Sequence, residues 1–201
     1  MIYLITRSYF PYDNSGGGLA RYSLVNFLKE NGFKVKIIRV GKKNSIKSDE
    51  YVFRNPLPTK VSTALQRIGL INDYLSLWVI RVLHCEKINI KTNDIIISTS
   101  GGELGPMSLG NKLSKRYGAY HIAQLHDPID YAKINKLNIN SSLHWDRTSL
   151  YYRILNDVDL IQTTTVNYCD FLRSKLIKSK IKCHYLGYSK INRIKKNKRP
   201  K

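Results

Sequence analysis

The sequence is poor in acidic residues, in cysteine and in long apolar runs. Its 201 residues include 14 Asp and Glu against 34 Lys and Arg, a formal net charge of +20. The three cysteines, Cys85, Cys169 and Cys183, are odd in number and lack the spacing of metal ligands, which excludes a disulfide scaffold and predicts reduced thiols in a cytoplasmic protein. No apolar run reaches the roughly 18 residues of a membrane-spanning helix. The first residues lack the basic and apolar regions of a signal peptide.

The excess of positive charge is concentrated near the end of the chain. Residues 1–170 carry 22 basic and 14 acidic residues, a net charge of +8, whereas residues 171–201 carry 12 basic and no acidic residues. This distribution favours a charged surface or tail over a charged core. With 42% hydrophobic and 10% aromatic residues, the chain can bury one core. We predict a single domain over residues 1–188 and a basic linker or tail over 189–201.

Strand-like and helix-like segments alternate along the chain. Short apolar runs of the kind found in buried strands lie at 2–6, 35–40, 94–98, 120–125, 160–163 and 181–185, with a further short strand expected at 51–54. Helical patterns lie between them, from residue 19 to the Asn31-Gly32 stop, over 61–85 with a break near Gly69, and over 103–117, 143–155 and 166–176. This order predicts an α/β fold, an open, Rossmann-like parallel sheet with helices on both faces.

A glycine-rich segment follows the first strand. Phe10 to Gly18 has the composition of a long loop, and its last residues, Ser15-Gly16-Gly17-Gly18, precede a helix. Bare backbone N–H groups at a helix start favour phosphate binding. The segment does not match GxGxxG and stands too far from its strand for a dinucleotide fingerprint, and no P-loop motif occurs. A flexible turn without a ligand is the alternative interpretation.

Four sets of residues, in order along the chain, resemble one enzyme family. They are Tyr9-Phe10-Pro11 with Gly16-Gly17-Gly18-Leu19-Ala20-Arg21-Tyr22 and Asn31-Gly32-Phe33-Lys34-Val35; 94–98 with Gly101-Gly102; Gln124-Leu125-His126-Asp127-Pro128; and Val158-Asp159-Leu160-Ile161-Gln162-Thr163 with Phe171-Leu172. Together they resemble the N-terminal domain of GT-B glycosyltransferases of the family 4 type. The resemblance covers nearly the whole chain.

The resemblance implies a function and a missing partner. Such enzymes have two Rossmann-like domains with the active site between them, usually retain the anomeric configuration, and need no metal or other cofactor. A nucleotide-sugar is the donor, and a glycan or a lipid-linked saccharide is the acceptor, here in bacterial surface polysaccharide assembly. The family's C-terminal domain carries most of the nucleotide pocket and an E-x7-E motif, which this chain lacks. We therefore expect a C-terminal GT-B domain to complete the site in cis or in trans.

Candidate site residues follow from these matches. His126 matches the histidine beside the transferred sugar, with a structural role as the alternative, and Asp127 is a second catalytic candidate that can instead cap the loop. The candidate donor-diphosphate residues are Gly16, Gly17, Gly18 and Arg21, and the candidate acceptor-cleft residues are Thr99, Ser100, Gly101 and Gly102. The competing interpretation of Arg21 is an exposed helix residue. The competing interpretation of residues 99–102 is a simple turn. No histidine has the spacing of a metal ligand, so we expect no metal site.

Two non-catalytic functions remain as alternatives. The 143–155 helix combines Trp145, Leu150, Tyr151, Tyr152 and Ile154 with Arg147 and Arg153. Such a helix can lie on an anionic membrane, at the inner face of the cytoplasmic membrane, or its aromatics can belong to the core. The charge of +20 also suits nucleic acid. We find no helix-turn-helix, RRM or KH signature, which makes a nucleic-acid partner the less favoured interpretation.

Overall fold

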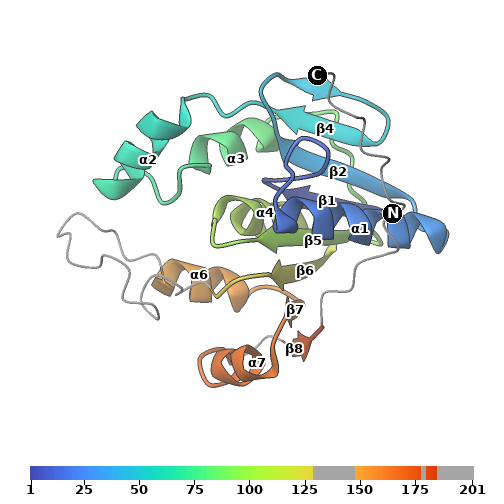
Figure 1. Ribbon diagram of the computed structural model, residues 1–201, viewed down its shortest axis with the longest axis vertical. Coiled ribbons are helices and arrows are strands. Elements are labelled where there is room, and N and C mark those ends of the chain that lie inside the picture. The colour runs from blue at the N-terminus through green and yellow to red at the C-terminus, as the bar shows by residue number, and fades with distance from the viewer. Residues whose placement is uncertain (129–147, 178–179, 185–201) are drawn as a thin grey trace, which may run out of the picture.

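An eight-stranded sheet forms the centre of the computed structural model, which describes residues 1–128, 148–177 and 180–184 (Figure 1). The strands are β1 (Ile2–Thr6), β2 (Val35–Val40), β3 (Ser45–Ile46), β4 (Glu50–Phe53), β5 (Ile95–Ser100), β6 (Tyr120–Leu125), β7 (Leu160–Thr163) and β8 (Lys180–Cys183). Their order across the sheet is β3-β4-β2-β1-β5-β6-β7-β8. All neighbours are parallel except the β3–β4 pair at one edge.

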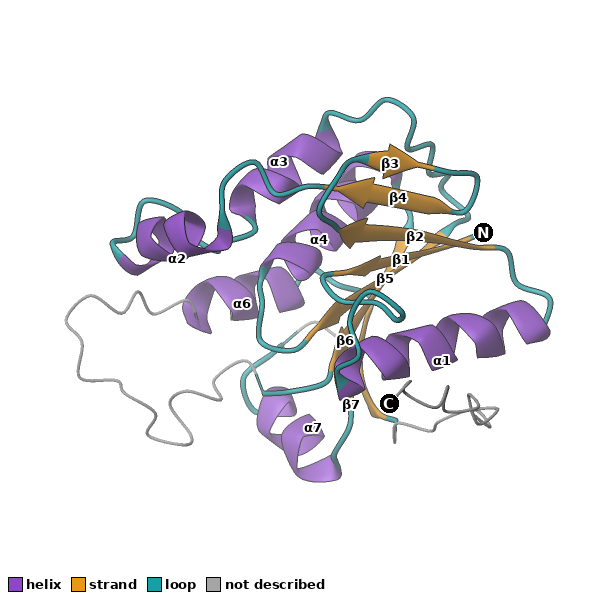
Figure 2. Cartoon of the chain, turned by 45° about the horizontal axis from the view of Figure 1, so that its top comes forward, coloured by secondary structure: helices purple, strands orange, loops and turns teal. Residues whose placement is uncertain are grey.

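The helices cover both faces of the sheet, as Figure 2 shows. They are α1 (Gly16–Glu30), α2 (Thr59–Arg67), α3 (Ser76–Leu83), α4 (Gly105–Tyr117), α6 (Thr148–Leu155) and α7 (Val166–Arg173). Alternate residues of β1 enter different cores: Leu4 packs in a cluster with Val25 of α1, whereas Tyr3 packs in a cluster with Trp78 of α3 and Leu109 of α4. Because β1 is covered on both faces, its five residues are all buried and its sequence is a continuous apolar run.

The predicted fold class is confirmed. Strands β1, β2, β6 and β7 have the predicted bounds, and the predicted helix over 61–85 is two helices that flank Gly69. Helix α4 ends at Gly118, whose φ of 67° lies in the left-handed region that glycine adopts cheaply. The predicted domain boundary at residue 188 and the basic segment 189–201 lie outside the described residues.

Three local predictions were wrong. The two-residue antiparallel strand β3 was not predicted, because it is too short to show a pattern. Gly16, Gly17 and Gly18 form the first turn of α1 and not the end of a loop, since the Ser15 side chain caps that turn by accepting a hydrogen bond from the Gly18 N–H (3.2 Å). Thr99 and Ser100 belong to β5 itself and do not follow it.

The described part of the 143–155 helix, for which a membrane-facing and a core role were both left open, is largely a core helix. This part, α6, buries Tyr151, Ile154 and Leu155 at 1%, 7% and 0% exposure, in one cluster with β6, β7 and α7. For the described residues, the core interpretation is therefore the correct one, since Leu150 and Tyr152 also pack against this cluster. Trp145 and Arg147 lie outside the described residues.

Candidate active site at the carboxyl edge of the sheet

The strand order reverses direction between β1 and β5. The chain moves from β1 outward to β2 and β4, then returns to place β5 on the other side of β1. In open parallel sheets, ligands bind at such a switch point, outside the carboxyl ends of the strands. There Arg7 and Ser8 follow β1, Gly101 follows β5, and His126 follows β6. The first turns of α1 also reach this edge, because Arg21 is hydrogen-bonded to Ser8.

Arg21 is a buried bridge between these elements. It is only 3% exposed, its Nε donates a hydrogen bond to Thr99 Oγ1 (2.8 Å), and its Nη1 donates to Ser8 Oγ. The interpretation of Arg21 as an exposed helix arginine is therefore wrong. Burial lowers the pKa of Arg21, and the negative charge of nearby Glu103 partly opposes that shift. Arg21 thus places a fixed positive charge where β1, β5 and α1 meet.

Close packing requires a glycine at residue 18, and it brings Gly17 against the Arg21 side chain. A Cβ on Gly18 would be closer to the carbonyl oxygen of Asp13 than any van der Waals contact permits, and a Cβ on Gly17 would lie 2.8 Å from Arg21 Nη1. A Cβ on Gly16 would meet nothing within 4 Å. The glycines therefore allow the preceding loop and the Arg21 side chain to lie directly against the start of α1.

Glu103 and Asp127 bring negative charge to the same place. Glu103 is 5% exposed, and its Oε2 accepts a hydrogen bond from the Gly101 N–H (3.1 Å). Its Oε1 lies 3.9 Å from Arg7 Nε and is a buried atom without a hydrogen-bond partner in the described part of the chain. A Cβ added to Gly101 would lie 3.3 Å from Asp127 Oδ2, 3.6 Å from Glu103 Oε2 and 3.9 Å from Arg21 Nη2. Gly101 thus sits among two carboxylates and a guanidinium.

His126 stands at the end of β6 with an unused ring nitrogen. Its backbone N–H donates to the Ser100 carbonyl (3.0 Å), which continues the β5–β6 ladder by one residue and fixes the position of the side chain. Its Nε2 is buried, and no described residue forms a hydrogen bond with it. Burial first, and then the positive charge of Arg21, lower the pKa of His126 to about 4. The ring is therefore neutral near pH 7 and can exchange a hydrogen bond with a ligand hydroxyl.

The predicted acceptor-cleft residues divide into two kinds. The side chain of Thr99 holds Arg21, and Gly101 lies among the charged groups. Ser100 instead builds the turn, because its Oγ donates to the Glu103 carbonyl (2.6 Å) and accepts from the Gly102 N–H (3.0 Å). Gly102 has a φ of 104°, which favours glycine. Contact of these residues with an acceptor stays a prediction.

Sequence reasoning did not single out Arg7 and Glu103. Both could have been found from their places, since each is the first charged residue after a predicted strand, and charged groups at the carboxyl edge of a parallel sheet are candidates for function. Arg7 also donates to the hydroxyl of Tyr74 (3.2 Å). Their mutual approach depends on the turn at residues 100–103, which has no sequence signature strong enough to predict.

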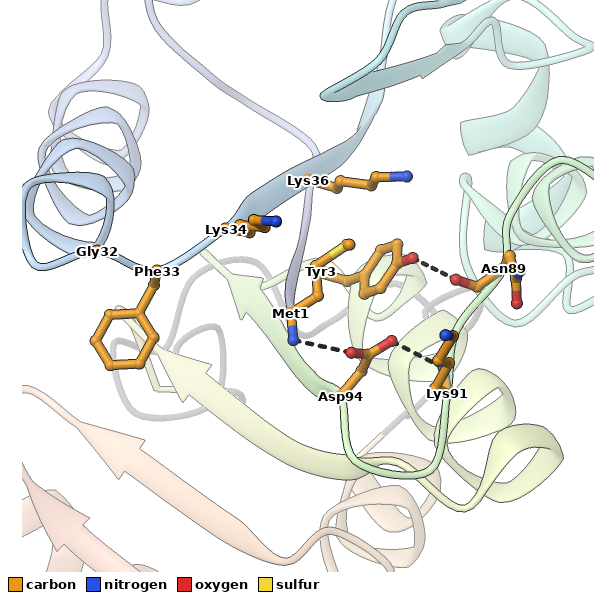
Figure 3. Close-up of a pocket in the computed structure, with 9 residues that line it drawn as sticks. All are labelled: Met1, Tyr3, Gly32, Phe33, Lys34, Lys36, Asn89, Lys91 and Asp94. Atoms are coloured by element: carbon orange, nitrogen blue, oxygen red, sulfur yellow. Dashed lines mark hydrogen bonds and ion pairs between the residues drawn. The ribbon is translucent and has the colours of Figure 1, made fainter.

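A hollow lies at the opposite edge of the sheet (Figure 3). Its volume is about 580 Å³, and Lys34, Lys36 and Lys91 line it together with Asp94. Asp94 is already paired with the Met1 ammonium group (2.9 Å) and accepts from the Lys91 N–H (2.8 Å), so the hollow is positive overall. It lies at the amino ends of β1 and β2, where open parallel sheets do not usually bind their substrates. The carboxyl edge remains the candidate active site.

The described residues contain neither a cluster of metal-binding side chains nor a membrane-spanning helix. Within them, no group of three or more His, Cys, Asp and Glu side chains is placed to hold a metal ion. No described helix is both long and apolar enough to cross a bilayer. The expectation of a metal-independent site stays a prediction.

Comparison with known proteins supports the fold. No protein-family model matches the sequence, and no curated protein matches it significantly. Among solved structures, the chain is similar to trehalose-6-phosphate synthase OtsA, with a TM-score of 0.51 and 13% sequence identity. The match covers 94% of this chain and 50% of that one, so this chain spans about half the length of its structural neighbour. The chain therefore has a Rossmann-like α/β fold similar to one half of that GT-B structure. The match does not assign it to family 4.

Proposed function

We propose that this chain is the acceptor-side half of a retaining, metal-independent glycosyltransferase related to family 4. It transfers a hexosyl group from a nucleotide-sugar to a saccharide or lipid-linked acceptor in bacterial surface polysaccharide biosynthesis. The observation that carries the proposal is the buried, neutral His126 ring with an unpaired Nε2 at the switch point, beside Arg21.

The chemistry of glycosyl transfer suits these groups. As the bond between sugar and diphosphate breaks, positive charge develops on the sugar ring and negative charge on the leaving group. A neutral imidazole can hold a sugar hydroxyl in place without adding positive charge beside the developing cation. The carboxylate of Asp127, at the same edge, favours that cation electrostatically.

The negative leaving group suits the other side of the site. The N-terminus of α1, at Gly16 and Gly17, presents backbone N–H groups and the positive end of the helix dipole. Arg21 is held by Ser8 and Thr99, so it contributes a fixed positive charge, and its direct contact with phosphate is not required. Preorganised charges of this kind need no rearrangement during the reaction.

A second domain is part of the proposal. The chain spans half of its structural neighbour, and the family that it resembles places most donor-binding groups in the other half. We propose that a C-terminal GT-B domain, in cis or in trans, supplies the nucleotide pocket and closes the site.

The test is sugar transfer by this chain together with its completing domain, assayed against a panel of nucleotide-sugars and followed by NMR of the product anomer. We expect transfer with retention. His126→Ala should lower kcat on the order of a hundredfold while leaving the melting temperature nearly unchanged. His84→Ala, at an exposed histidine that caps the C-terminal end of α3, is the matched control and should retain activity. Equal turnover by His126→Ala and the parent would remove His126 from the mechanism.

A further inference from the structure

Helix α2 turns an apolar stripe toward solvent. Val61 and Ile68 are 45% and 58% exposed, Leu70 just beyond the helix is 69% exposed, and Ala64 is exposed between them. Residues 61, 64 and 68 follow the spacing that places side chains on one helix face. Ser62 is the buried residue of this helix. An ordinary surface helix buries its apolar stripe, whereas α2 leaves Val61 and Ala64 exposed together with its charged residues.

The surroundings of this stripe are positive. Lys60 and Arg67 are exposed on the same helix, and the chain contains no acidic residue between Glu50 and Asp73. Asp73 does not offset that charge at the surface, because it is 1% exposed and its carboxylate accepts hydrogen bonds from the backbone N–H groups of residues 75 and 104. The exposed charged groups of α2 are therefore all cationic.

The position of α2 leaves the stripe accessible. Both views show α2 projecting beyond the strands at the end of the molecule away from the N-terminus (Figures 1 and 2). We call the set of Lys60, Val61, Ala64, Arg67, Ile68 and Leu70 the α2 face. Leu70 also lines a hollow with Asp157, whose carboxylate is paired with Lys115 (2.6 Å). An exposed apolar group flanked by unpaired cations is complementary to an anionic phospholipid surface, where acyl chains accept the apolar side chains and headgroups attract the cations.

We propose that the α2 face docks this protein on an anionic phospholipid bilayer. This surface differs from the 143–155 helix that the sequence suggested, whose described tyrosine and isoleucine side chains at 151 and 154 are buried. Docking places apolar side chains in the interface and leaves the sheet above it. No helix needs to cross the membrane for this mode of attachment.

A chain of contacts joins the α2 face to the candidate active site. Gln66 Oε1 of α2 accepts a hydrogen bond from the Tyr74 N–H (2.8 Å), and the Tyr74 hydroxyl accepts from Arg7 Nη1 (3.2 Å). Arg7 Nε in turn lies 3.9 Å from Glu103 Oε1. A bilayer at α2 therefore lies next to the carboxyl edge of the sheet. If the proposed function holds, on which this step rests, the acceptor is a lipid-linked saccharide presented at that surface.

The experiment is vesicle flotation with the full chain and no sugar substrate. Vesicles contain phosphatidylcholine alone or phosphatidylcholine with phosphatidylglycerol. Because the basic residues after residue 170 also attract anionic lipid, binding is measured again at about 0.5 M salt, where exposed charges are screened. We expect the parent chain to float with the phosphatidylglycerol vesicles and to retain part of that binding in salt.

Two variants and a matched control decide the result. Ile68→Ser combined with Leu70→Ser should weaken salt-resistant binding on the order of tenfold, and Lys60→Gln combined with Arg67→Gln should weaken low-salt binding. Ile177→Ser is the control, since Ile177 is 94% exposed and lies beyond α7. Circular dichroism checks that each variant folds as the parent does.

Several outcomes would overturn the proposal. They are absence of binding by the parent, equal binding by parent and Ile68/Leu70 variant, or an equal loss in Ile177→Ser. A change of oligomeric state in the Ile68/Leu70 variant, with vesicle binding unaltered, would show instead that the α2 face contacts protein. The assay contains no donor, so its failure would leave the proposed sugar transfer standing. Failure of sugar transfer alone would leave the docking standing.

Discussion

The Nε of Arg21 lies 2.8 Å from Oγ1 of Thr99, across 78 positions of sequence. This bond ties the second turn of α1 to the carboxyl end of β5. With the bond from Arg21 to Ser8, it holds the loop after β1 against the next strand of the sheet. The hydroxyls of Ser8 and Thr99 accept hydrogen bonds from the Arg21 guanidinium in a buried position. Leaving these polar groups without partners there would cost free energy of folding.

Arg21→Ala should therefore destabilise the fold by about 2–4 kcal/mol, because it leaves the hydroxyls of Ser8 and Thr99 without their charged partner. Arg21→Lys should recover only part of that loss, since an ammonium cannot reproduce the planar fork. Urea unfolding measures both. Arg153→Lys, at an exposed arginine of α6, is the control and should change the free energy of unfolding by less than about 0.5 kcal/mol. Comparable effects at both positions would contradict the bridging role.

Gly18→Ala and Gly16→Ala should change stability in opposite directions. The new methyl group at residue 18 collides with the Asp13 carbonyl, whereas at residue 16 it meets nothing within 4 Å. Overlap with backbone should cost about 2 kcal/mol or more. At residue 16, alanine should be neutral or stabilising by up to about 1 kcal/mol, because it reduces the freedom of the unfolded chain. Thermal unfolding of the two variants side by side tests this, and a stable Gly18→Ala protein would refute the packing argument.

Stability should fall as the pH drops below neutrality. Burial lowers the pKa of His121 to about 3, and burial with the charge of Arg21 lowers that of His126 to about 4. An unfolded histidine titrates near about 6.5. Between those values the unfolded chain binds protons that the folded chain does not, so stability present above pH 6.5 is lost toward pH 4.

Each histidine should contribute a slope of up to about 1.4 kcal/mol per pH unit. Urea midpoints measured from pH 7 to pH 5 give the slope above the range where most carboxylates titrate. His126→Gln should remove the contribution of His126 to this slope. The contribution of His121, whose Nε2 lies 2.7 Å from Ser98 Oγ, should remain. The same slope in parent and variant would show that His126 titrates equally in the folded and unfolded chains.

Glu103→Gln should lower stability by about 1–2 kcal/mol. The amide oxygen can still accept from the Gly101 N–H. The negative charge of Glu103 near Arg7 and Arg21 is lost, so the repulsion between these two cations is opposed only by the remaining carboxylates, such as Asp13 and Asp127. Part of the loss should be recovered at high salt, because screening weakens that repulsion. Unfolding measured at low and high sodium chloride distinguishes charge repulsion from a packing defect. Salt would not reduce the loss of stability caused by a packing defect.

The parts of the fold that were predictable have strong local signals. β1 and β2 are short apolar runs, and α4 ends at a glycine that takes the left-handed conformation. The position of His126 followed from the end of the β6 apolar run. β3 has two residues and no pattern, and the aromatic residues of the 143–155 helix suit a membrane surface as well as a core. For that helix, only the packing of Tyr151 against its neighbours decided the matter.

The sequence by itself determined the α/β class, the order of most strands and helices along the chain, and the residues that reach the carboxyl edge of the sheet. These depend on local periodicity and on the rule that parallel strands end at the same edge. Tertiary structure alone decided that Arg21 is buried, that Glu103 approaches Arg7 and Gly101, and that α2 exposes its apolar stripe. Those properties depend on contacts between residues far apart in sequence. A local sequence pattern does not indicate which distant residues it will contact in the folded chain.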